Sequence, residues 1–587
     1  MNSYFLGHLE SRRPFHLPRS SFDTHWHFIG RTGKGKTTAL QTIFHNLLGD
    51  PSFEPCVVII DRLGGLSFDL LRWLASDYCP SYVRERLVYV EPARDDVVLG
   101  FNPLLPRCEG ERYYRVFRAV DAILRGWESQ DIEKMPRLAR WLFNSFYACS
   151  LSGLTIADSA HLLSPGTDLH TAILRTLPTE LKTEWESLVK TSPNQVAITL
   201  DSTRNRLKPF HEAPPLRRMF GATTGGLDML RFMKEGKILL LNLSAGNRLP
   251  EHVSDAIGGL IINEVMTTAR SLPMGVRYPT YMVLDEFQRF VGPDIRDAIP
   301  EVRQLGIKLL LSHQSMSQLK VGETDLTSMI FQAQSRMIFG LQGEDADILA
   351  HELASLTFDP YKIKNELFSQ KQRIVGHRSV QTRSYSTSES DGQNWMENYG
   401  RNSSRSENFQ YREIGLPIRS AGKSDGDSQG GGSGGSSGRS VTESVNETLV
   451  PIHQDYVELM NRTYTTFDED WHVWGRNVRL LRKGMAFVRL VDNANLYTVA
   501  VKRSVPGYLA LDVERITKDA PQLLDEVEEL KEENFKQECF SSPASIDRET
   551  QERLKNILQK PISAGGPLNP RMSPTASESE TTSPFGV

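Results

Sequence analysis

The sequence predicts an α/β protein built on a largely parallel sheet. Short apolar runs bounded by turn residues alternate with helical segments, as in WHFIG followed by KTTALQTIFHNLLG. Such runs, without polar alternation, are typical of strands covered on both faces. They occur before and after a stretch of purely helical periodicity, so we expect one sheet interrupted by an all-α insertion. The expected strands are WHFI at 26–29, CVVIID at 56–61, LVYV at 87–90, KILLLNL at 237–243, YMVLD at 281–285, KLLLS at 308–312 and RMIFG at 336–340.

Changes in composition along the 587-residue chain predict its domain organisation. A Ser/Gly/Asn-rich stretch cannot bury enough apolar surface to order itself, which predicts a linker. The alternation in GMAFVRLVDNANLYTVAV predicts a hairpin after it. The basic N-terminus is interpreted as an arm or an edge element. The expected segments are an N-terminal arm (1–24), the first part of the core (25–106), an all-α insertion domain (107–220), the second part of the core (221–378), a disordered linker (379–450), a C-terminal β segment that returns to the core (451–510), and an acidic helix with a disordered tail (511–587).

Composition and charge restrict the functional classes. The formal net charge is only -4, so a nucleic-acid-binding role requires a local basic surface. The five cysteines form no C-x-x-C pair, which favours a reducing compartment and argues against a zinc site. No run approaches the roughly 18 apolar residues of a spanning helix. We therefore expect a cytoplasmic protein without a transmembrane segment of its own, which reaches a membrane only through partners.

A glycine-rich loop stands between the first expected strand and its helix. The segment GRTGKGKT fits the pattern G-x-x-x-x-G-K-[ST] without deviation. Glycines let backbone N–H groups turn toward phosphate oxygens, and the following helix presents its positive end to the same anion. Lys36 is then placed to reach the β- and γ-phosphates, and the Thr37 hydroxyl to bind Mg²⁺. The expected nucleotide-binding residues are Gly30, Arg31, Thr32, Gly33, Lys34, Gly35, Lys36, Thr37 and Thr38.

Two acids, Asp285 and Glu286, end the strand YMVLD. The carboxyl ends of parallel strands are where α/β sheets bind ligands. We expect Asp285 to hold Mg²⁺ together with Thr37, and Glu286 to polarise the attacking water. Asp61 also ends an apolar strand, and it is either a neighbour of the phosphates or a cap of the turn that follows. These features predict a P-loop ATPase that binds ATP and Mg²⁺.

The motifs after the acid pair narrow the interpretation. The segment EVRQLGIKLLLSHQSMSQL places a helix with Arg303 before a strand that ends at His313 and Gln314. This order resembles the HerA/FtsK superfamily of ring-shaped DNA pumps and, more narrowly, the TraG/TraD-type coupling proteins of conjugation and type IV secretion. The segments CVVIIDRLGG, FNPL at 101–104 and LLLNLSAG, with the helical block, agree with it. The resemblance covers about residues 25–355 and implies a RecA-like P-loop fold.

The resemblance implies further roles. Gln314 matches a strand-end glutamine that senses the γ-phosphate, for which an amide is suited because it both donates and accepts. Arg303 matches an arginine that reaches a neighbouring subunit's phosphates, so the expected assembly is a homo-oligomer, a hexameric ring. Arg336 is a lesser candidate for the same task. DNA is expected to be bound through its phosphates, independently of sequence, with Arg289 and Arg296 as the candidate contacts.

The expected function is therefore an ATP-hydrolysing, DNA-translocating motor for conjugative or type IV secretion DNA transfer, with secretion or relaxase partners. One feature departs from membrane-bound coupling proteins: the P-loop begins at Gly30 and leaves no room for spanning helices, so we expect a soluble relative or one anchored by a partner. The alternative is an NTP-gated assembly or adaptor ATPase that moves no DNA and docks through the acidic helix. A metabolic kinase fits poorly with the insertion and with Gln314.

Overall fold

The computed structural model describes residues 3–127, 135–223, 225–244, 249–273, 275–290, 302–321, 324–390, 400–411, 417–428, 438–491, 493–504, 518 and 521–559. The chain divides into two compact units. The first consists of Met1–Phe358 with Phe467–Val587, and the second of Asp359–Thr466.

The first unit is built on an 11-stranded sheet with the order β2-β1-β18-β17-β12-β3-β9-β8-β4-β7-β5. The strands from β12 to β5 pair in parallel, and the remaining strands pair antiparallel on the β12 side. The expected α/β class is confirmed. Across the sheet the strands are β2 (Pro14–Pro18), β1 (Ser3–Leu9), β18 (Asn493–Val501), β17 (Met485–Leu490), β12 (Ser335–Ile338), β3 (Trp26–Ile29), β9 (Ile307–His313), β8 (Thr280–Asp285), β4 (Cys56–Asp61), β7 (Ile238–Asn242) and β5 (Leu87–Val90).

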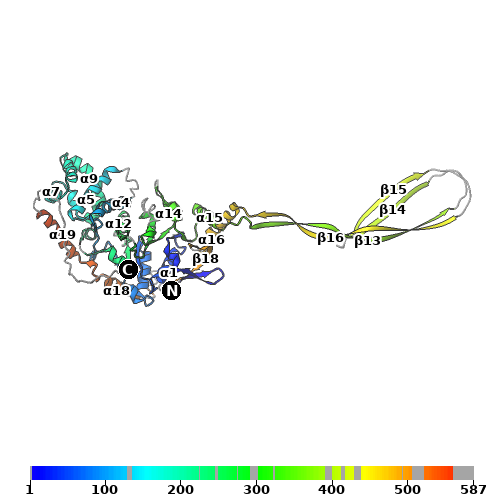
Figure 1. The fold of residues 1–587 in the computed structure, drawn as a ribbon, viewed down its shortest axis with the longest axis horizontal. Coiled ribbons are helices and arrows are strands. Elements are labelled where there is room, and N and C mark those ends of the chain that lie inside the picture. The colour runs from blue at the N-terminus through cyan, green and yellow to red at the C-terminus, as the bar shows by residue number, and fades with distance from the viewer. Residues whose placement is uncertain are drawn as a thin grey trace, which may run out of the picture. The chain divides into compact units, whose positions relative to one another are not determined.

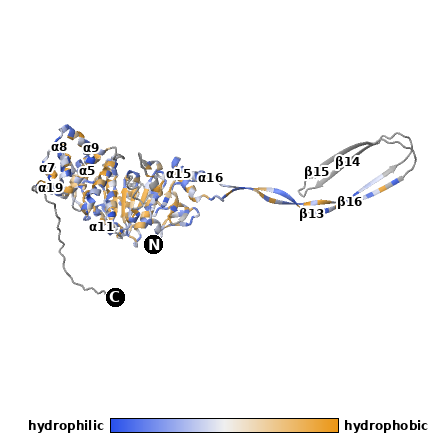
Figure 2. Cartoon of the chain, turned by 45° about the horizontal axis from the view of Figure 1, so that its top comes forward, coloured by the Kyte–Doolittle hydropathy of each residue, from blue (hydrophilic) through white to orange (hydrophobic). Residues whose placement is uncertain are grey.

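The parallel strands are covered on both faces, which explains their continuous apolar sequences. Successive residues of β4 belong to different hydrophobic clusters: Val58 and Ile60 to one, Val57 and Ile59 to the other. Figure 2 shows hydrophobic residues gathered in this part of the molecule. One face packs against α1 (Lys36–Leu48), α2 (Gly65–Ala75) and α18 (Gln522–Asn534), and the other against α4 (Arg112–Gly126), α12 (Glu251–Arg270) and α15 (Gly343–Thr357).

Between α4 and the end of α10, the described residues contain helices and no strand, in the stretch for which helical periodicity predicted an insertion. Figure 1 shows α5, α7 and α9 grouped at one end of the first unit. This block is not a separate compact unit, because α4 packs on α12 and its buried residues join the cluster on the sheet. The remaining helices of this region are α5 (Pro136–Ser152), α6 (Ser159–Leu162), α7 (Asp168–Arg175), α8 (Thr179–Val189), α9 (Pro193–Glu212), α10 (Pro214–Met219) and α11 (Met229–Glu235).

Short elements connect the larger ones. They are η1 (Arg19–Asp23), α3 (Ser81–Arg84), β6 (Val98–Leu99), η2 (Glu109–Glu111), η5 (Phe287–Arg289), η6 (Met316–Leu319), β10 (Lys320–Val321), β11 (Thr324–Asp325), α14 (Thr327–Phe331) and β19 (Phe540–Ser541). No helix among the described residues combines the length and the apolar character needed to cross a bilayer.

The N-terminal residues are an edge element of the sheet rather than a free arm. Strands β1 and β2 pair with each other, and β1 pairs with β18. Leu6, Phe15 and Leu17 are buried, so their hydrophobic contacts hold this hairpin against the core although the segment is rich in basic residues.

The prediction of a disordered linker over 379–450 was wrong for its described residues. The second unit is a ribbon in which β13 (Ile363–Ser390) pairs with β16 (Gly438–Tyr464). A second pair, β14 (Gly400–Tyr411) and β15 (Pro417–Ser428), lies between them in the chain. The composition argument counted buried apolar surface, whereas these strands satisfy backbone N–H and C=O groups by pairing, and β13 and β16 leave most of their described side chains exposed. The Gly-rich residues 429–437 lie outside the described residues.

The boundaries expected after the linker also change. Residues 451–464 belong to the ribbon rather than to the core, and the return to the core begins with α16 (Phe467–Leu480), followed by the predicted hairpin β17–β18. The acidic helix is α18, but Val527 and Leu530 are buried, and it packs on α2 and β5. Part of the predicted disordered tail is α19 (Pro543–Gln559), whose few, widely spaced apolar residues gave only a weak signal.

We expect the ribbon to contribute little to the stability of the first unit. Ile363 and Tyr464 are partners in the ribbon, so a short Gly/Ser linker can replace residues 363–464. Because the closure cost of a flexible loop grows slowly with its length, the melting temperature of the shortened protein should lie within about 2 °C of the parent's.

As a control, Leu530→Ala removes a buried contact of α18 and should lower the melting temperature measurably. Loss of cooperative unfolding on ribbon replacement would contradict the division into two units.

Candidate functional site

The P-loop joins the carboxyl end of β3 to the first residue of α1. Gly33 has φ +76° and Gly35 has φ +115°, conformations that L-residues with side chains rarely adopt. At Gly30 a Cβ atom would lie 2.4 Å from the Cβ of Phe339, so only glycine fits there. The side chains of Arg31, Thr32 and Thr37 are exposed. These glycines therefore give the loop before α1 the backbone conformations that a phosphate cradle at a helix N-terminus requires.

The P-loop is hydrogen-bonded to segments that are distant in the sequence. The backbone N–H of Arg31 donates to the carbonyl of Gly340 at 3.2 Å, and the N–H of Gly484 donates to the carbonyl of Lys34 at 2.9 Å. The Lys34 ammonium donates to the carbonyl of Leu481 at 3.3 Å. Lys34, expected among the nucleotide-binding residues, thus also fastens the loop to the start of β17.

The ammonium of Lys36 is almost buried, with 8% of the residue exposed, and it donates to the carbonyl of Gly30. Burial lowers the pKa of Lys36, while the negative charges of Asp285 and Glu286 act in the opposite direction. Lys36 therefore lies within electrostatic range of the acid pair, at the carboxyl ends of the central strands.

Asp285 ends β8 beside Ser312 of β9. Burial raises the pKa of Asp285 to about 6. The neighbouring Ser312 hydroxyl opposes this shift, and the negative charges of Asp61 and Glu286 add to it. A carboxylate crowded by other carboxylates is electrostatically suited to a divalent cation.

Glu286 follows in a strained conformation. Its φ of 56° and ψ of 45° place a non-glycine residue in the left-handed region, which costs of order 1–3 kcal/mol. The side chain is 7% exposed, and its two oxygens accept amide N–H groups from Gln314 at 2.6 Å and from Gln288 at 2.7 Å. This arrangement holds the carboxylate in one orientation at the end of the strand.

Gln314 connects the P-loop to the acid pair. Its Nε2 donates to Glu286 Oε1, and its Oε1 accepts the Thr32 hydroxyl at 2.7 Å. The connection is possible because β9 lies between β3 and β8, so the residue after β9 emerges between the two motifs. The expected association of Lys36, Asp285, Glu286 and Gln314 is thus seen in the structure.

Asp61 caps the turn that follows β4, which was the second of the two interpretations of this residue. It is fully buried, and its carboxylate accepts the backbone N–H groups of Leu63 at 3.1 Å, Gly64 at 2.8 Å and Ser67 at 2.6 Å. These bonds cap the turn and the start of α2. Asp61 therefore influences the site only through its charge beside Asp285.

Neither Arg303 nor Arg336 lies in the site of its own chain. Arg303 is exposed and precedes β9, so it lies at the amino edge of the sheet, opposite the P-loop. Arg336 is 2% exposed and bonded to Glu352 and to the carbonyl of Ile330, so it cannot serve as an inter-subunit finger. Arg289 is exposed on η5, whereas Arg296 lies outside the described residues.

Sequence reasoning missed two groups of the site. Gln288 lies two residues after Glu286, where no motif requires an amide. His27 and His313 form a buried pair between β3 and β9, and each reads as an ordinary strand residue in the sequence. The histidine contact has no local signal, because it depends on which strands are neighbours in the sheet, whereas the Gln288 contact spans only two residues and matches no known motif.

The donor set fits Mg²⁺ and not a metal held by protein side chains alone. Among the described residues, no three His, Cys, Asp or Glu side chains form a group that could hold a metal. The Thr37 hydroxyl and the Asp285 carboxylate are hard oxygen donors beside the cradle. Mg²⁺ commonly takes one or two protein oxygens and completes its coordination with water and phosphates.

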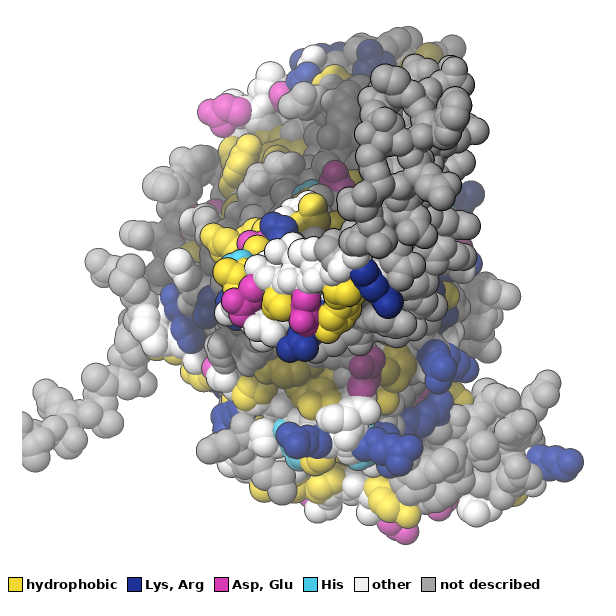
Figure 3. All heavy atoms as spheres, turned by 90° about the vertical axis from the view of Figure 1, so that its right-hand side faces the viewer, with side chains coloured by type: hydrophobic (Ala, Val, Ile, Leu, Met, Phe, Trp, Pro, Cys, Tyr) yellow, Lys and Arg dark blue, Asp and Glu magenta, His cyan; other side chains and the backbone are white. Residues whose placement is uncertain are grey.

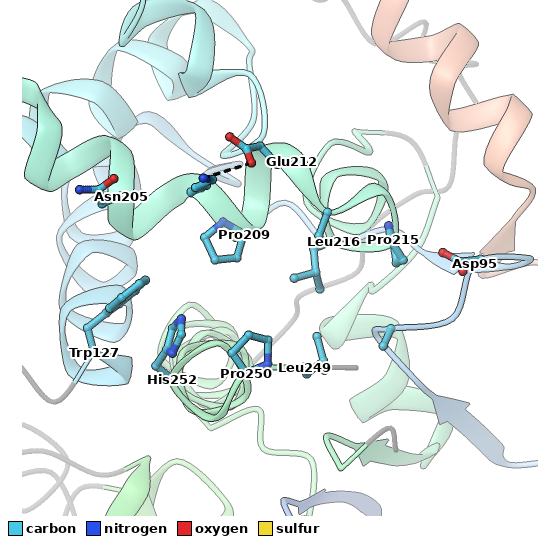
Figure 4. Close-up of a pocket in the computed structure, with 13 residues that line it drawn as sticks. Asp95, Trp127, Asn205, Pro209, Glu212, Pro215, Leu216, Leu249, Pro250 and His252 are labelled. Atoms are coloured by element: carbon cyan, nitrogen blue, oxygen red, sulfur yellow. Dashed lines mark ion pairs between the residues drawn. The ribbon is translucent and has the colours of Figure 1, made fainter. Parts of the chain in front are cut away.

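Several clefts lie away from this site. A cleft of about 630 Å³ lies between the end of α4, the α9–α10 segment and the start of α12, where the rings of Trp127 and His252 are 3.9 Å apart. Figure 4 shows its mostly apolar wall, with Pro209, Leu216 and Pro250. It contains no P-loop or acid-pair residue, so the nucleotide site is assigned from its chemistry rather than from its volume.

Figure 3 shows one face of the molecule with its side chains coloured by type. On the face in Figure 3, the coloured Lys and Arg side chains are distributed among acidic and hydrophobic ones. This face alone does not identify a DNA-binding surface.

Residues 279–394 match the family model described as the TraM recognition site of TraD and TraG. This segment extends from the start of β8, through the acid pair and Gln314, past the end of β13. The resemblance to TraG/TraD-type proteins is thereby confirmed for this part of the chain. A search of curated proteins found no match.

Several solved structures were found at low similarity. The bacterial conjugative coupling protein TrwBdeltaN70 is 14% identical with a TM-score of 0.45, over 85% of this chain and 88% of that chain. The plasmid coupling protein TrwB in complex with ADP and Mg²⁺ is 14% identical with a TM-score of 0.44, over 84% and 87%. VirB4 of Thermoanaerobacter pseudethanolicus is 14% identical with a TM-score of 0.38, over 61% and 89%.

The raised pKa of Asp285 predicts that replacing its carboxyl group with a neutral one stabilises the folded protein, by an amount that depends on pH. The pKa of Asp285 is about 6 in the folded protein and 3.8 in the unfolded chain. The carboxyl group therefore does not lower the free energy of unfolding below pH 3.8, and it lowers it by the full amount above about pH 6. In nucleotide-free protein, Asp285→Asn should therefore raise the melting temperature at pH 7.5 by about 2 °C or more. The difference from the parent should shrink at pH 4.5.

Other carboxyl groups cancel in the comparison of the parent with the variant at each pH. Equal differences at both pH values would contradict the assigned pKa.

Proposed function

We propose that the protein is an ATP-hydrolysing motor that translocates DNA, acting as a coupling protein in conjugative or type IV secretion DNA transfer. The observation that carries the hydrolytic part is the continuous hydrogen-bonded connection from Thr32 through Gln314 to Glu286. The match of residues 279–394 to the TraD and TraG family model supports the assignment to DNA transfer.

The phosphates of ATP bind the P-loop amides and Lys36, whose ammonium is held between the loop and the acid pair. Thr37 and Asp285 would hold Mg²⁺, which would neutralise part of the phosphate charge. Glu286 orients and polarises the attacking water, and this requires an ionised carboxylate. Gln288 and Gln314 each donate an amide N–H to one of its oxygens, and these bonds fix the direction in which the carboxylate faces.

Arg303 contributes in trans within a ring. It is exposed at the edge of the sheet opposite its own P-loop, so only the site of another subunit is open to it. A guanidinium supplied to a transferring phosphoryl group stabilises the developing charge. The assembly is a homo-oligomer, a hexamer by resemblance. DNA binds through its phosphates, with Arg289 as a described candidate contact.

The rival function is an NTP-gated assembly or adaptor ATPase that moves no DNA. The ribbon unit favours it, because its strands expose large hydrophobic side chains such as Leu367, Tyr385, Leu449 and Val457. Such side chains suit contacts with a protein partner. The family model also covers β13, and its description names recognition of TraM by TraD and TraG.

A motor predicts ATP turnover that DNA stimulates and that rises with protein concentration as rings assemble. Glu286→Gln should bind ATP with an affinity within about 3-fold of the parent's and slow turnover by on the order of 10² or more, because the phosphate cradle remains while water activation is lost. Steady-state ATPase assays with and without DNA, across protein concentration, check this.

Lys36→Ala is the matched control, which should lose both nucleotide binding and turnover. ATP turnover that is indifferent to duplex and single-stranded DNA would favour the adaptor. Parental turnover by Glu286→Gln would remove that residue from the catalytic role.

An arginine acting between subunits predicts complementation. Arg303→Ala should bind ATP normally and hydrolyse it roughly 10³-fold more slowly or worse. Mixed with Lys36→Ala, which still offers its own Arg303 to a neighbour, it should recover part of the activity. Turnover is measured for each variant alone and for the mixture, at concentrations where the protein assembles.

Arg277→Ala is the control on a half-buried arginine near Arg303, since the Arg277 guanidinium donates to the carbonyl of Gln304. It should keep parental turnover. Full activity of Arg303→Ala alone, or no recovery on mixing, would exclude the trans role.

A further inference from the structure

A pair of buried histidines lies directly under the site. His27 of β3 and His313 of β9 are both fully buried, with their rings stacked at a centroid distance of 4.9 Å. Their Nε2 atoms are 2.7 Å apart, a hydrogen-bond distance. Phe287, which follows the acid pair, packs the edge of its ring against His313. The pair therefore connects the P-loop strand to the glutamine strand just below their carboxyl ends.

The contacts assign one proton arrangement. The Nδ1 of His313 is 2.9 Å from the Ser315 carbonyl, which can only accept, so Nδ1 carries the hydrogen. Burial holds the pKa of His313 at about 3, so its ring is neutral and its Nε2 is an acceptor. His27 must then donate from its own Nε2. Among the described residues, Nδ1 of His27 has no hydrogen-bond partner. A hydrogen on this nitrogen would be a buried donor without an acceptor, which would cost more than an unpaired acceptor there.

The bond from His313 to Ser315 closes a turn around Gln314. The residue between them is the one whose side chain contacts Thr32 and Glu286. On the other side of the turn, Gln318 Oε1 accepts the N–H groups of Gln314 at 3.2 Å and Ser315 at 3.1 Å. The backbone direction of Gln314 is thus fixed by side chains on both sides, and His313 keeps its orientation through His27.

We propose that His27 is a positioning residue for Gln314: by donating from Nε2 it holds His313 in the orientation that closes the turn, and so sets the glutamine amide between the P-loop and Glu286. This inference rests on the proposed function as an ATPase. His27 touches neither nucleotide nor water. It acts through the backbone of a residue that does, and therefore affects turnover more than nucleotide binding.

The test compares two substitutions of His27 in the full-length protein. His27→Leu removes the donor and leaves His313 Nε2 unpaired, whereas His27→Gln places an amide donor at a similar reach from the strand. We expect kcat to fall by about 10-fold or more in His27→Leu with KM within about 3-fold, because a small misplacement of a group at the reacting centre mainly slows chemistry. His27→Gln should return kcat to within about 3-fold of the parent's.

His170→Leu is the control, because His170 is similarly buried in the all-α insertion and bonds the Leu162 carbonyl. It should leave kcat unchanged in the folded protein. If His27→Leu does not fold, His27→Phe, which keeps a ring without the donor, takes its place.

The outcomes separate the two levels of inference. Parental kcat in folded His27→Leu, or an equal loss in His27→Gln and His27→Leu, would overturn the positioning role while leaving the ATPase intact. A parent protein without ATP turnover would overturn the proposed function, and the positioning role with it.

Discussion

The site depends on the parallel pairing of β9 between β3 and β8. This register places Ile29 opposite His313 and Asp285 opposite Ser312, so the carboxyl ends of the three strands agree to within one residue. The P-loop, Gln314 and Glu286 then emerge side by side from neighbouring strands. Were β9 at an edge of the sheet, the two classical NTPase motifs would still be present in the sequence, but no amide would stand between them.

Charge balance is the second constraint at these strand ends. Lys36, Asp285 and Glu286 are all largely removed from water, and each would be costly alone. The acids oppose the fall in the pKa of Lys36, whereas Asp61 and Glu286 push the pKa of Asp285 upward. The free site thus carries more negative charge than its single lysine offsets, a condition that favours binding of a cation with the nucleotide.

How much the sequence could predict follows from the range over which each signal acts. The P-loop and the acid pair are local patterns, and the structure places Lys36 and Glu286 as those patterns predicted. The ribbon was mispredicted because a paired backbone can order a Ser-rich segment without burying it. Helix α19 and the contacts of Gln288 and His27 depend on neighbours that no local pattern names. The sequence alone allows Arg336 to act on a neighbouring subunit, because its burial against Glu352 becomes apparent only in the structure.

The two helices that flank the ribbon also contact both halves of the site. Helix α15 precedes the ribbon, and its Asp345 accepts the N–H of Met316, next to the glutamine turn. Helix α16 follows the ribbon and packs on α15. Directly after it, the Leu481 carbonyl receives the Lys34 ammonium of the P-loop. Contacts of α15 and of the residue after α16 thus reach the glutamine turn and the P-loop, the two segments that the Gln314 side chain helps to join.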